Sequence, residues 1–266
     1  MKVLVTGATG FVGQEVLQEL HAAGHTTRLL ARRPESGQMR KLTSEFNASA
    51  FSGNVLQAET LDTAMLGVDA VIHLVGIISE IGKQTFENVH VQAAQNVVGA
   101  AKRAGVRRFI HMSALGTRPK AASRYHQTKR AAEEIVRGSG LEWTVFRPSL
   151  IYGPGDHFVS LFAKLARLSP VLPVTGPGTA KMQPVAVGEV AACFVRALTE
   201  PSAAGRTFDV CGPETLTFPE ILRAILAATG RKRFLVRVPL GVARVQAACL
   251  EWLYPVLLHR APSEAY

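Results

Sequence analysis

Short apolar runs alternate with longer amphipathic stretches along the first part of the chain. Val3–Val5 is such a run, and Val16, Leu17 and Leu20 follow it at the spacing of one helix face. The runs that predict strands are Val3–Val5, Thr27–Ala31, Ser49–Phe51, Ala70–Val75, Arg108–Met112 and Trp143–Arg147. The stretches that predict helices are Gly13–Ala23, Thr60–Leu66 with Leu61 and Leu66 inward, Asn88–Ala104 ending at Gly105, and Ser123–Gly138. This alternation indicates an α/β fold, a doubly wound parallel sheet with helices on both faces.

After Pro148, proline and glycine become frequent and the regular alternation is lost. The further elements that the pattern predicts are a helix at Val187–Leu198, a strand at Thr207–Val210 and a helix at Phe218–Thr229. We therefore expect residues 1–150, completed by about 185–212, to form the core. Residues 151–184 and 213–266 would form a small substrate lobe.

The segment Leu240–Leu258 is apolar, but Arg244, Glu251 and Pro255 interrupt it, so it is a poor candidate for a membrane-spanning helix. Two interpretations of this segment stay open. In the first, the segment is a helix packed on the small lobe; in the second, it docks on a membrane surface or a protein partner. The anchors in the second case would be Trp252, Leu253, Tyr254 and Leu257.

Composition and charge limit the kinds of ligand and function that we expect. The 266 residues are 47% apolar, and the net charge of +10 is scattered along the chain without a DNA-binding motif. We therefore expect a small-molecule substrate and no nucleic acid. Cys193, Cys211 and Cys249 have neither metal-site nor disulfide spacing, and no other pattern suggests a metal. With the first strand predicted at residue 3, we expect no signal peptide and a cytoplasmic location, peripheral to the inner membrane if the last segment docks there.

A glycine pattern, Gly7-x-x-Gly10-x-x-Gly13, joins the first predicted strand to the first predicted helix. Strand, glycine turn and helix together are typical of the Rossmann dinucleotide-binding motif. The glycines let the backbone approach a pyrophosphate, and the helix N-terminus offers it unpaired N–H groups. The cofactor-binding residues expected in this turn are Gly7, Thr9, Gly10, Phe11, Val12 and Gly13.

The end of the second predicted strand indicates which nucleotide binds. NAD-binding folds usually carry an acidic residue there for the ribose 2′-hydroxyl, whereas this chain has Arg32 and Arg33. Two guanidinium groups suit a 2′-phosphate, so the sequence favours NADP(H) over NAD(H). Asn54 and Val55 lie in a turn that would reach the adenine edge.

Tyr125 and Lys129 lie four residues apart in a predicted helix and so share one face. An ammonium group beside a phenol favours the phenolate, so we expect Lys129 to lower the pKa of Tyr125. The tyrosine could then exchange a proton with a carbonyl or an alcohol while a nicotinamide carries the hydride. Ser113, just after the fifth predicted strand, could hydrogen-bond the same substrate oxygen.

Taken together, the glycine turn, Ser113, Tyr125-x-x-x-Lys129 and the motif from Arg147-Pro148-Ser149 to Tyr152-Gly-Pro-Gly-Asp156 resemble the extended and atypical short-chain dehydrogenases/reductases. The texture from His111 to Asp156 is most similar to the branch with the NADPH-binding accessory subunit of respiratory complex I and its bacterial relatives. The resemblance implies Tyr125 as acid/base, with Lys129 holding both Tyr125 and the nicotinamide ribose. It implies that Ser113 orients the substrate. Further cofactor contacts implied are Leu74, Val75, Gly76, Pro148 and Ile151.

Three functions stay open. The leading hypothesis is an NADP(H)-dependent oxidoreductase acting on a carbonyl, quinone or similar small apolar substrate. The second is an NADPH-binding structural or assembly subunit of a larger, complex I-like respiratory assembly, without turnover. The third is a nucleotide-sugar epimerase or dehydratase, whose diphosphate would need cations such as Arg124, Arg147 or Arg206. The apolar strip Leu74–Ile78 counts against a sugar substrate. The sequence leaves the oligomeric state open.

Overall fold

The computed structural model describes residues 1–239 and Gly241. The described residues divide into two compact units, the first made of residues 1–155 and 184–213 and the second of 156–183 and 214–239. Residues 151–155, 184 and 213, expected in the substrate lobe, therefore belong to the first unit. The apolar segment Leu240–Leu258, with the interpretations placed on it, lies outside the described residues except for Gly241.

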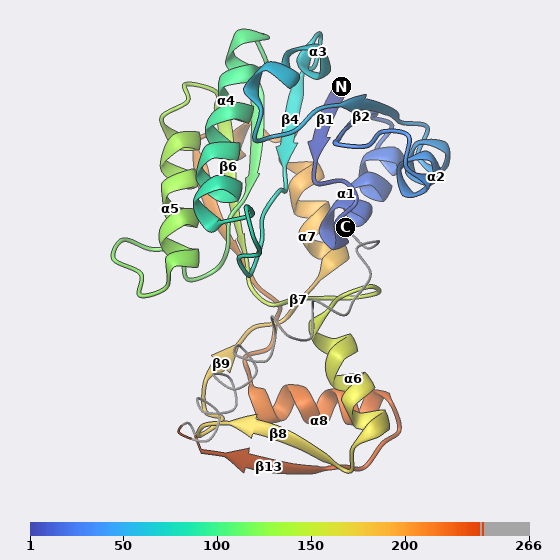
Figure 1. Cartoon of the computed structure of the whole chain (residues 1–266), viewed down its shortest axis with the longest axis vertical. Coiled ribbons are helices and arrows are strands. Elements are labelled where there is room, and N and C mark those ends of the chain that lie inside the picture. The colour runs from blue at the N-terminus through green and yellow to red at the C-terminus, as the bar shows by residue number, and fades with distance from the viewer. Residues whose placement is uncertain (240, 242–266) are drawn as a thin grey trace. The chain divides into compact units, whose positions relative to one another are not determined.

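The first unit is built on a seven-stranded parallel sheet in the order β11-β6-β5-β4-β1-β2-β3 (Figure 1). Its strands are β1 (Lys2–Thr6), β2 (Thr26–Ala31), β3 (Ser49–Ser52), β4 (Ala70–His73), β5 (Arg108–Met112), β6 (Glu142–Pro148) and β11 (Arg206–Val210). A strand was predicted at each of these places. The doubly wound parallel sheet predicted from the alternation is confirmed.

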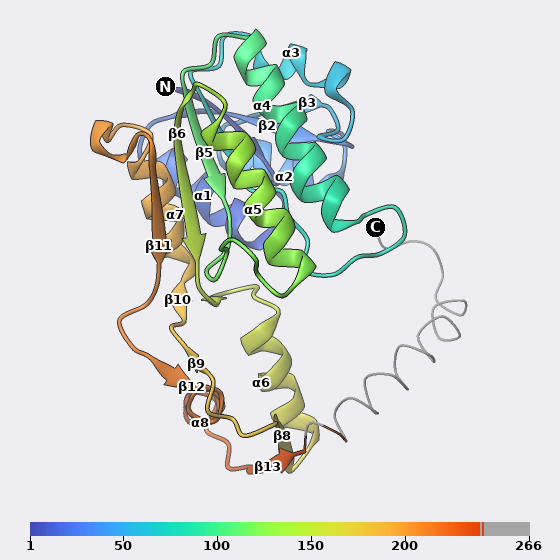
Figure 2. The ribbon, with the colours of Figure 1, turned by 90° about the vertical axis from the view of Figure 1, so that its left-hand side faces the viewer.

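Helices cover both faces of this sheet. The helices of the unit are α1 (Phe11–Ala22), α2 (Gly37–Glu45), α3 (Asp62–Met65), α4 (Ala93–Arg103), α5 (Arg124–Arg137) and α7 (Val187–Arg196). Its shorter elements are 3₁₀ turns at Ala58–Thr60 and Pro201–Ala203, a π-helical turn at Glu87–Gln92, and the paired strands β7 (Ile151–Tyr152) and β10 (Val185–Ala186). In Figure 2, α5 lies beside β5 and β6.

Side chains alternate along each strand between two buried cores. Val5 and Ile72 belong to the core under α1 and α7, whereas Leu4, Val71 and Phe109 belong to the core under α3, α4 and α5. By the same alternation, Thr6 and His73 at the ends of β1 and β4, and His111 one residue before the end of β5, turn polar groups toward the α4–α5 face. This edge, where the parallel strands end, is where doubly wound folds bind ligands.

Three local expectations differ from the structure. Leu66, expected inward, is 64% exposed, because α3 ends at Met65 and a turn at Gly67 with φ +64° follows. The helix expected over Asn88–Ala104 begins with a π-helical turn. Helix α2, which the sequence reading missed, begins at the N-cap Ser36, whose hydroxyl accepts the Met39 N–H.

The second unit contains α6 (Phe158–Leu168), α8 (Phe218–Ala228) and two small sheets. The sheets pair β8 (Val171–Thr175) with β13 (Phe234–Val238), and β9 (Lys181–Met182) with β12 (Leu216–Thr217). Helices α6 and α8 meet through edge-on contacts between Phe162 and Phe218, whose ring centroids lie 5.4 Å apart. Within the described part of the chain, no helix is both long enough and apolar enough to cross a bilayer.

Candidate active site

The glycine turn between β1 and α1 is packed so closely that side chains do not fit. Gly7 has φ +83°, and a Cβ on Gly13 would lie 2.3 Å from the Gly7 carbonyl oxygen. Gly10 is the N-cap of α1, and the first turn of the helix contains no acidic side chain. The unpaired N–H groups and positive dipole end of α1 are therefore open to an anion, as a pyrophosphate site requires.

The chain after β4 passes directly beside this turn. The Leu74 N–H donates to the Thr6 carbonyl, and a Cβ on Gly7 would lie 3.2 Å from the Val75 nitrogen. Two glutamine side chains, Gln14 and Gln38, donate to the Thr9 carbonyl at 3.3 and 3.2 Å. The structure thus brings the predicted glycine turn and Leu74–Gly76 together.

Arg32 and Arg33 follow β2 and are exposed. The nearby Glu35 pairs with Arg40 at 3.4 Å. Among residues 1–239, no acidic side chain pairs with Arg32 or Arg33, so both guanidinium groups are available to a phosphate.

In the turn after β3, polar groups of Asn54 and Val55, which were expected to contact an adenine ring, form hydrogen bonds within the protein. The Asn54 Oδ1 accepts the Leu56 N–H at 3.1 Å, and the Asn54 N–H donates to Thr60 Oγ1 at 2.9 Å. The Val55 carbonyl accepts from Asn96 Nδ2 at 2.8 Å. The side chain of Asn54 therefore shapes its own turn, and the acceptor predicted for the adenine is engaged within it.

Tyr125 and Lys129 lie in the first two turns of α5, on one face as predicted. Tyr125 is half-buried among aromatic rings, with the edge contacts of Phe86 and His90 at centroid distances of 5.7 and 5.4 Å. No other residue in the described part of the chain hydrogen-bonds its hydroxyl. The Lys129 ammonium is buried and donates to the Met112 carbonyl at 3.0 Å.

Burial determines the pKa values of both groups. It raises the pKa of Tyr125 above its usual range, because a phenolate loses hydration there. The expected lowering by Lys129 is therefore wrong for this structure, in which the ammonium bonds a backbone carbonyl. Burial also lowers the pKa of Lys129 to about 8, although the Glu133 carboxylate acts in the opposite direction.

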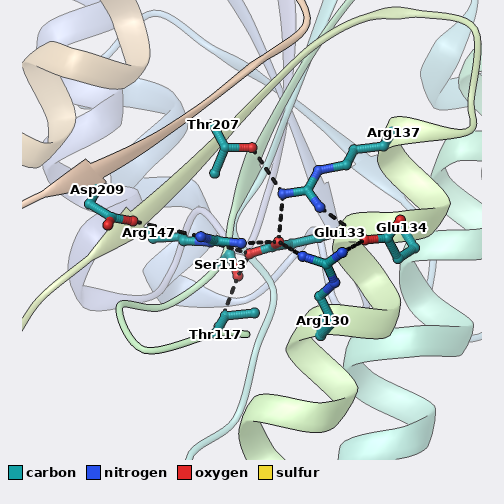
Figure 3. A network of polar contacts seen from close by, with 9 residues as sticks. All are labelled: Ser113, Thr117, Arg130, Glu133, Glu134, Arg137, Arg147, Thr207 and Asp209. Atoms are coloured by element: carbon teal, nitrogen blue, oxygen red, sulfur yellow. Dashed lines mark hydrogen bonds and ion pairs between the residues drawn. The ribbon is translucent and has the colours of Figure 1, made fainter. Parts of the chain in front are cut away.

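The Ser113 hydroxyl is engaged by a carboxylate in this structure. Its buried hydroxyl donates to Glu133 Oε1 at 2.6 Å and lies 3.4 Å from Thr117 Oγ1 (Figure 3). A hydroxyl whose proton is held by a carboxylate cannot also donate to a substrate oxygen. The expectation that Ser113 orients the substrate is not met here.

Glu133 is the centre of a buried network that the sequence reading missed. Its carboxylate is inaccessible to solvent and accepts two bonds from Arg147, both at 2.7 Å, and one from Arg137 at 2.9 Å (Figure 3). Arg130 also pairs with it. The spacing of Arg130, Glu133 and Arg137 along one helix face was a signal that could have revealed part of this network.

The cations considered for a sugar diphosphate are already engaged. Arg147 binds Glu133, Arg124 pairs with Glu80 at 3.0 Å, and the Arg206 guanidinium lies over the Phe208 ring. These contacts count against a nucleotide-sugar site built on the three arginines.

Pro148 and Ile151 lie where β6 leaves the sheet. The Pro148 carbonyl accepts the Leu115 N–H at 2.9 Å, and Ile151 pairs with Val185 in a parallel bridge. A Cβ on Gly153 would lie 3.7 Å from the Phe11 ring. The segment after β6 therefore lies beside the glycine turn.

Buried histidines line the same edge of the sheet. Thr6 Oγ1 and His73 Nδ1 lie 2.7 Å apart, and His73 stacks on His111. His73 Nε2 and both ring nitrogens of His111 have no hydrogen-bond partner among the described residues. Burial lowers the pKa of His73 to about 3, so both it and the similarly buried His111 are neutral at physiological pH.

Comparison with known proteins bears on this geometry. Residues 7–201 match the family model described as NAD(P)H-binding. A ceramide reductase of Caulobacter vibrioides is 31% identical and aligns over 89% of this chain and 73% of its own length. A (4-alkanoyl-5-oxo-2,5-dihydrofuran-3-yl)methyl phosphate reductase of Streptomyces griseus is 33% identical over 86% of this chain and 74% of its own.

A respiratory protein is also similar. NADH dehydrogenase (ubiquinone) 1 alpha subcomplex subunit 9 of Arabidopsis thaliana is 30% identical over 92% of this chain, which spans 62% of that protein.

Solved structures share the fold. A UDP-N-acetylglucosamine 4-epimerase from Bacillus cereus superposes with a TM-score of 0.73 at 23% identity, over 90% of this chain and 85% of its own. The dTDP-glucose 4,6-dehydratase DesIV from Streptomyces venezuelae superposes with a TM-score of 0.75 at 22% identity, over 90% of this chain and 84% of its own. At such identities the likeness is one of fold. The family match and the two reductases show that the chain belongs to the NAD(P)H-binding family.

Proposed function

We propose that this chain is an NADP(H)-dependent oxidoreductase for a carbonyl, quinone or similar small apolar substrate, with Tyr125 as the acid/base. The observation that carries the proposal is the position of Lys129. A Cβ on Gly76 would lie 3.1 Å from Lys129 Nζ, so the amine lies against the chain that leaves β4. Tyr125 lies one helical turn away, at the sheet edge where doubly wound folds bind ligands.

The residues present fit a bound nicotinamide nucleotide. The glycine turn and the first turn of α1 would hold its pyrophosphate through the unpaired N–H groups of the helix N-terminus. Gly13 lets that helix pack against the turn, since its Cβ would lie 2.3 Å from the Gly7 carbonyl oxygen. Lys129 keeps two ammonium protons beyond the one given to Met112, and these could hold the nicotinamide ribose. Bound NADPH would supply the hydride that reduces a carbonyl carbon.

Tyr125 would transfer the proton. As the carbonyl carbon gains a hydride, the Tyr125 hydroxyl would give its proton to the carbonyl oxygen, leaving an alcohol and a phenolate. Its raised pKa keeps Tyr125 protonated at neutral pH, which suits the reducing direction. Lys129 is mainly cationic below about pH 8, and solvent would reprotonate the Tyr125 phenolate after the transfer.

Apolar side chains on the chain between β4 and Tyr125's neighbour Phe86 support an apolar substrate. The chain between β4 and the π-helical turn exposes Ile78 and Ile81, whose exposed fractions are 84% and 53%. Phe86, at the end of that chain, contacts the Tyr125 ring. Two relatives are named as reductases, which supports catalytic turnover by this chain.

The preference for NADP(H) rests on Arg32 and Arg33. Both are exposed at the end of β2 and have no acidic partner among the described residues. A ribose 2′-phosphate would pair with them, whereas a 2′-hydroxyl offers no charge.

The test is steady-state oxidation of NADPH with aldehydes, ketones and quinones, in the unmodified chain and in Tyr125→Phe. We expect Tyr125→Phe to lose about 100-fold or more in kcat while binding NADPH normally, since general acid catalysis contributes roughly 10²–10⁴-fold. Lys129→Met should also lose activity, whereas Lys102→Met, a lysine in the last turn of α4, should not. Unchanged turnover in Tyr125→Phe would refute the assignment.

A second candidate is an NADPH-binding subunit of a larger respiratory assembly, without turnover. The identity of 30% to the Arabidopsis subunit favours it, although this chain spans 62% of that protein. In that case bound NADPH would stabilise the fold by mass action. NADPH would then raise the unfolding temperature, no acceptor would be reduced, and the chain would co-purify with a membrane-bound partner.

A further inference from the structure

His90 connects three parts of the first unit through one buried imidazole. It lies in the π-helical turn Glu87–Gln92, and only 2% of the residue is exposed. The Ile77 N–H donates to its Nε2 at 3.2 Å, and its Nδ1 lies 2.9 Å from Thr128 Oγ1. The ring therefore links the chain after β4 to α5, from a kind of helical turn that is frequent at functional sites.

Either neutral tautomer of the ring keeps this link. With the proton on Nδ1, Nε2 accepts the Ile77 N–H and Nδ1 donates to Thr128 Oγ1; with the proton on Nε2, this nitrogen donates to the Ile77 carbonyl and Nδ1 accepts from the Thr128 hydroxyl. In the first tautomer the Thr128 hydroxyl donates in turn to the carbonyl of Arg124 or Tyr125, each at 3.0 Å. In the second, the Ile77 carbonyl accepts from Nε2 at 3.1 Å.

The same ring is next to both candidate chemical groups. The edge of Tyr125 meets it at a centroid distance of 5.4 Å and an interplanar angle of 82°. A Cβ on Gly76 would lie 3.7 Å from His90 Nε2 and 3.1 Å from Lys129 Nζ, so the two nitrogens flank one glycine. Phe86 stacks on the ring at 5.4 Å.

We propose that His90 is a positioning residue, whose neutral imidazole fixes the chain after β4 against the first turn of α5 so that Tyr125 and Lys129 face one reacting point. The proposal rests on the function proposed above. A shift of about 1 Å in such a group can cost about 10²-fold in rate. His90 would act through Tyr125 and Lys129, without touching substrate itself.

Its surroundings keep the imidazole neutral. Lys129 and Tyr125 face it from α5, and His73 from β4 and His111 from β5 complete the buried basic cluster. Burial, and then the Lys129 charge, lower the pKa of His90 to about 3. A protonated His90 would place a second cation beside Lys129.

Three substitutions separate the contacts. His90→Gln retains an acceptor near the place of Nε2, His90→Asn retains a donor near the place of Nδ1, and His90→Phe retains only the ring. Glu80→Gln is the matched control, because it removes the exposed Glu80–Arg124 tie between the same two segments. We would measure kcat, the substrate KM and the NADPH Kd for each variant.

We expect His90→Phe to lose about 10- to 100-fold in kcat, with the NADPH Kd within about threefold of the unmodified chain. His90→Gln should recover most of that loss, and Glu80→Gln should stay within about twofold. A full kcat in His90→Phe would overturn the proposal. So would equal losses of kcat, NADPH binding and melting temperature in every His90 variant, since these indicate a purely structural role.

A second readout does not depend on turnover. Nitrogen NMR of the NADPH-loaded chain should show a neutral His90, with one ring nitrogen protonated and the other unprotonated, from pH 8 to pH 5. The carbon resonance of the Tyr125 ring, identified by its loss in Tyr125→Phe, should shift in His90→Phe and return in His90→Gln. If no acceptor oxidises NADPH, the proposed function fails. This resonance still decides the positioning role, and an unmoved signal in His90→Phe overturns it.

Discussion

Replacing the buried carboxylate of Glu133 tests the electrostatics of the site most sharply. Glu133→Gln keeps the side-chain shape but removes the charge that accepts bonds from Arg147 and Arg137. Removing one partner of a buried ion pair costs about 3–5 kcal/mol. The two guanidinium groups keep side-chain exposures of 17% and 23%, so water compensates in part. We therefore expect a loss at the low end, about 3 kcal/mol of unfolding free energy.

The adjacent Glu134 provides the control. It pairs with Arg130 and Arg137, as Glu133 does, but 52% of its side chain is exposed. Exposed pairs contribute about 0–1 kcal/mol, so Glu134→Gln should change stability little.

The assay is urea unfolding followed by circular dichroism, supported by calorimetry. A loss of about 3 kcal/mol corresponds to a fall of roughly 6–12 °C in Tm for a unit of this size. Glu133→Gln should also lower the pKa of Lys129 further, because the carboxylate charge now raises it. Equal losses below 1 kcal/mol in Glu133→Gln and Glu134→Gln would refute the reasoning.

Three further predictions concern the cofactor site and its pH dependence. Gly13→Ala should abolish NADPH binding and destabilise the first unit, because its Cβ would lie 2.3 Å from a backbone oxygen, whereas Gly37→Ala in α2, with nothing within 4 Å, should be neutral or slightly stabilising by calorimetry. Replacing Arg32 and Arg33 with serine should weaken NADPH binding by about 10- to 100-fold and leave NADH binding unchanged in calorimetric titration, since bonds to charged groups contribute about 1.5–3 kcal/mol. Lys129 has a lowered pKa of about 8, so the folded chain binds fewer protons than the unfolded chain between about pH 8 and the ordinary lysine value. Stability should therefore rise with pH across that window, while log kcat/KM should fall above about pH 8 as the cation is lost. Lys129→Met should remove both effects, and a flat pH profile in the unmodified chain would contradict this account.

The first unit could be predicted from the sequence because its signals are local. Continuous apolar strands, helical spacing and the glycine turn each depend on neighbouring residues, and Gly105 ends its helix with φ +70° as expected of a C-cap glycine. Helix α2 was missed because only Met39 and Leu42 of its residues are buried, which leaves a weak apolar stripe. In the second unit, strands as short as Lys181–Met182 and Leu216–Thr217 give too few positions for a period to show.

The polar site depended on long-range contacts that spacing does not encode. Alternation along β5 places Ser113 on the same face as His111, but nothing local indicates that Glu133 takes the serine proton. The direction of the Tyr125 pKa shift likewise follows from burial by Phe86 and His90, which come from another helix. The spacing of Tyr125 and Lys129 could be predicted from the sequence, whereas the pKa shifts of the two groups could be known only from the folded structure.

Single-turnover oxidation of NADPH bound to the purified chain tests the central claim most directly. The nicotinamide absorbance would be followed after mixing with aldehydes, ketones and quinones of increasing apolar length. The account predicts that at least one acceptor oxidises the bound NADPH and that Tyr125→Phe abolishes this reaction. Tight NADPH binding with no oxidation by any acceptor would contradict it, and would favour the subunit that binds the nucleotide without turnover.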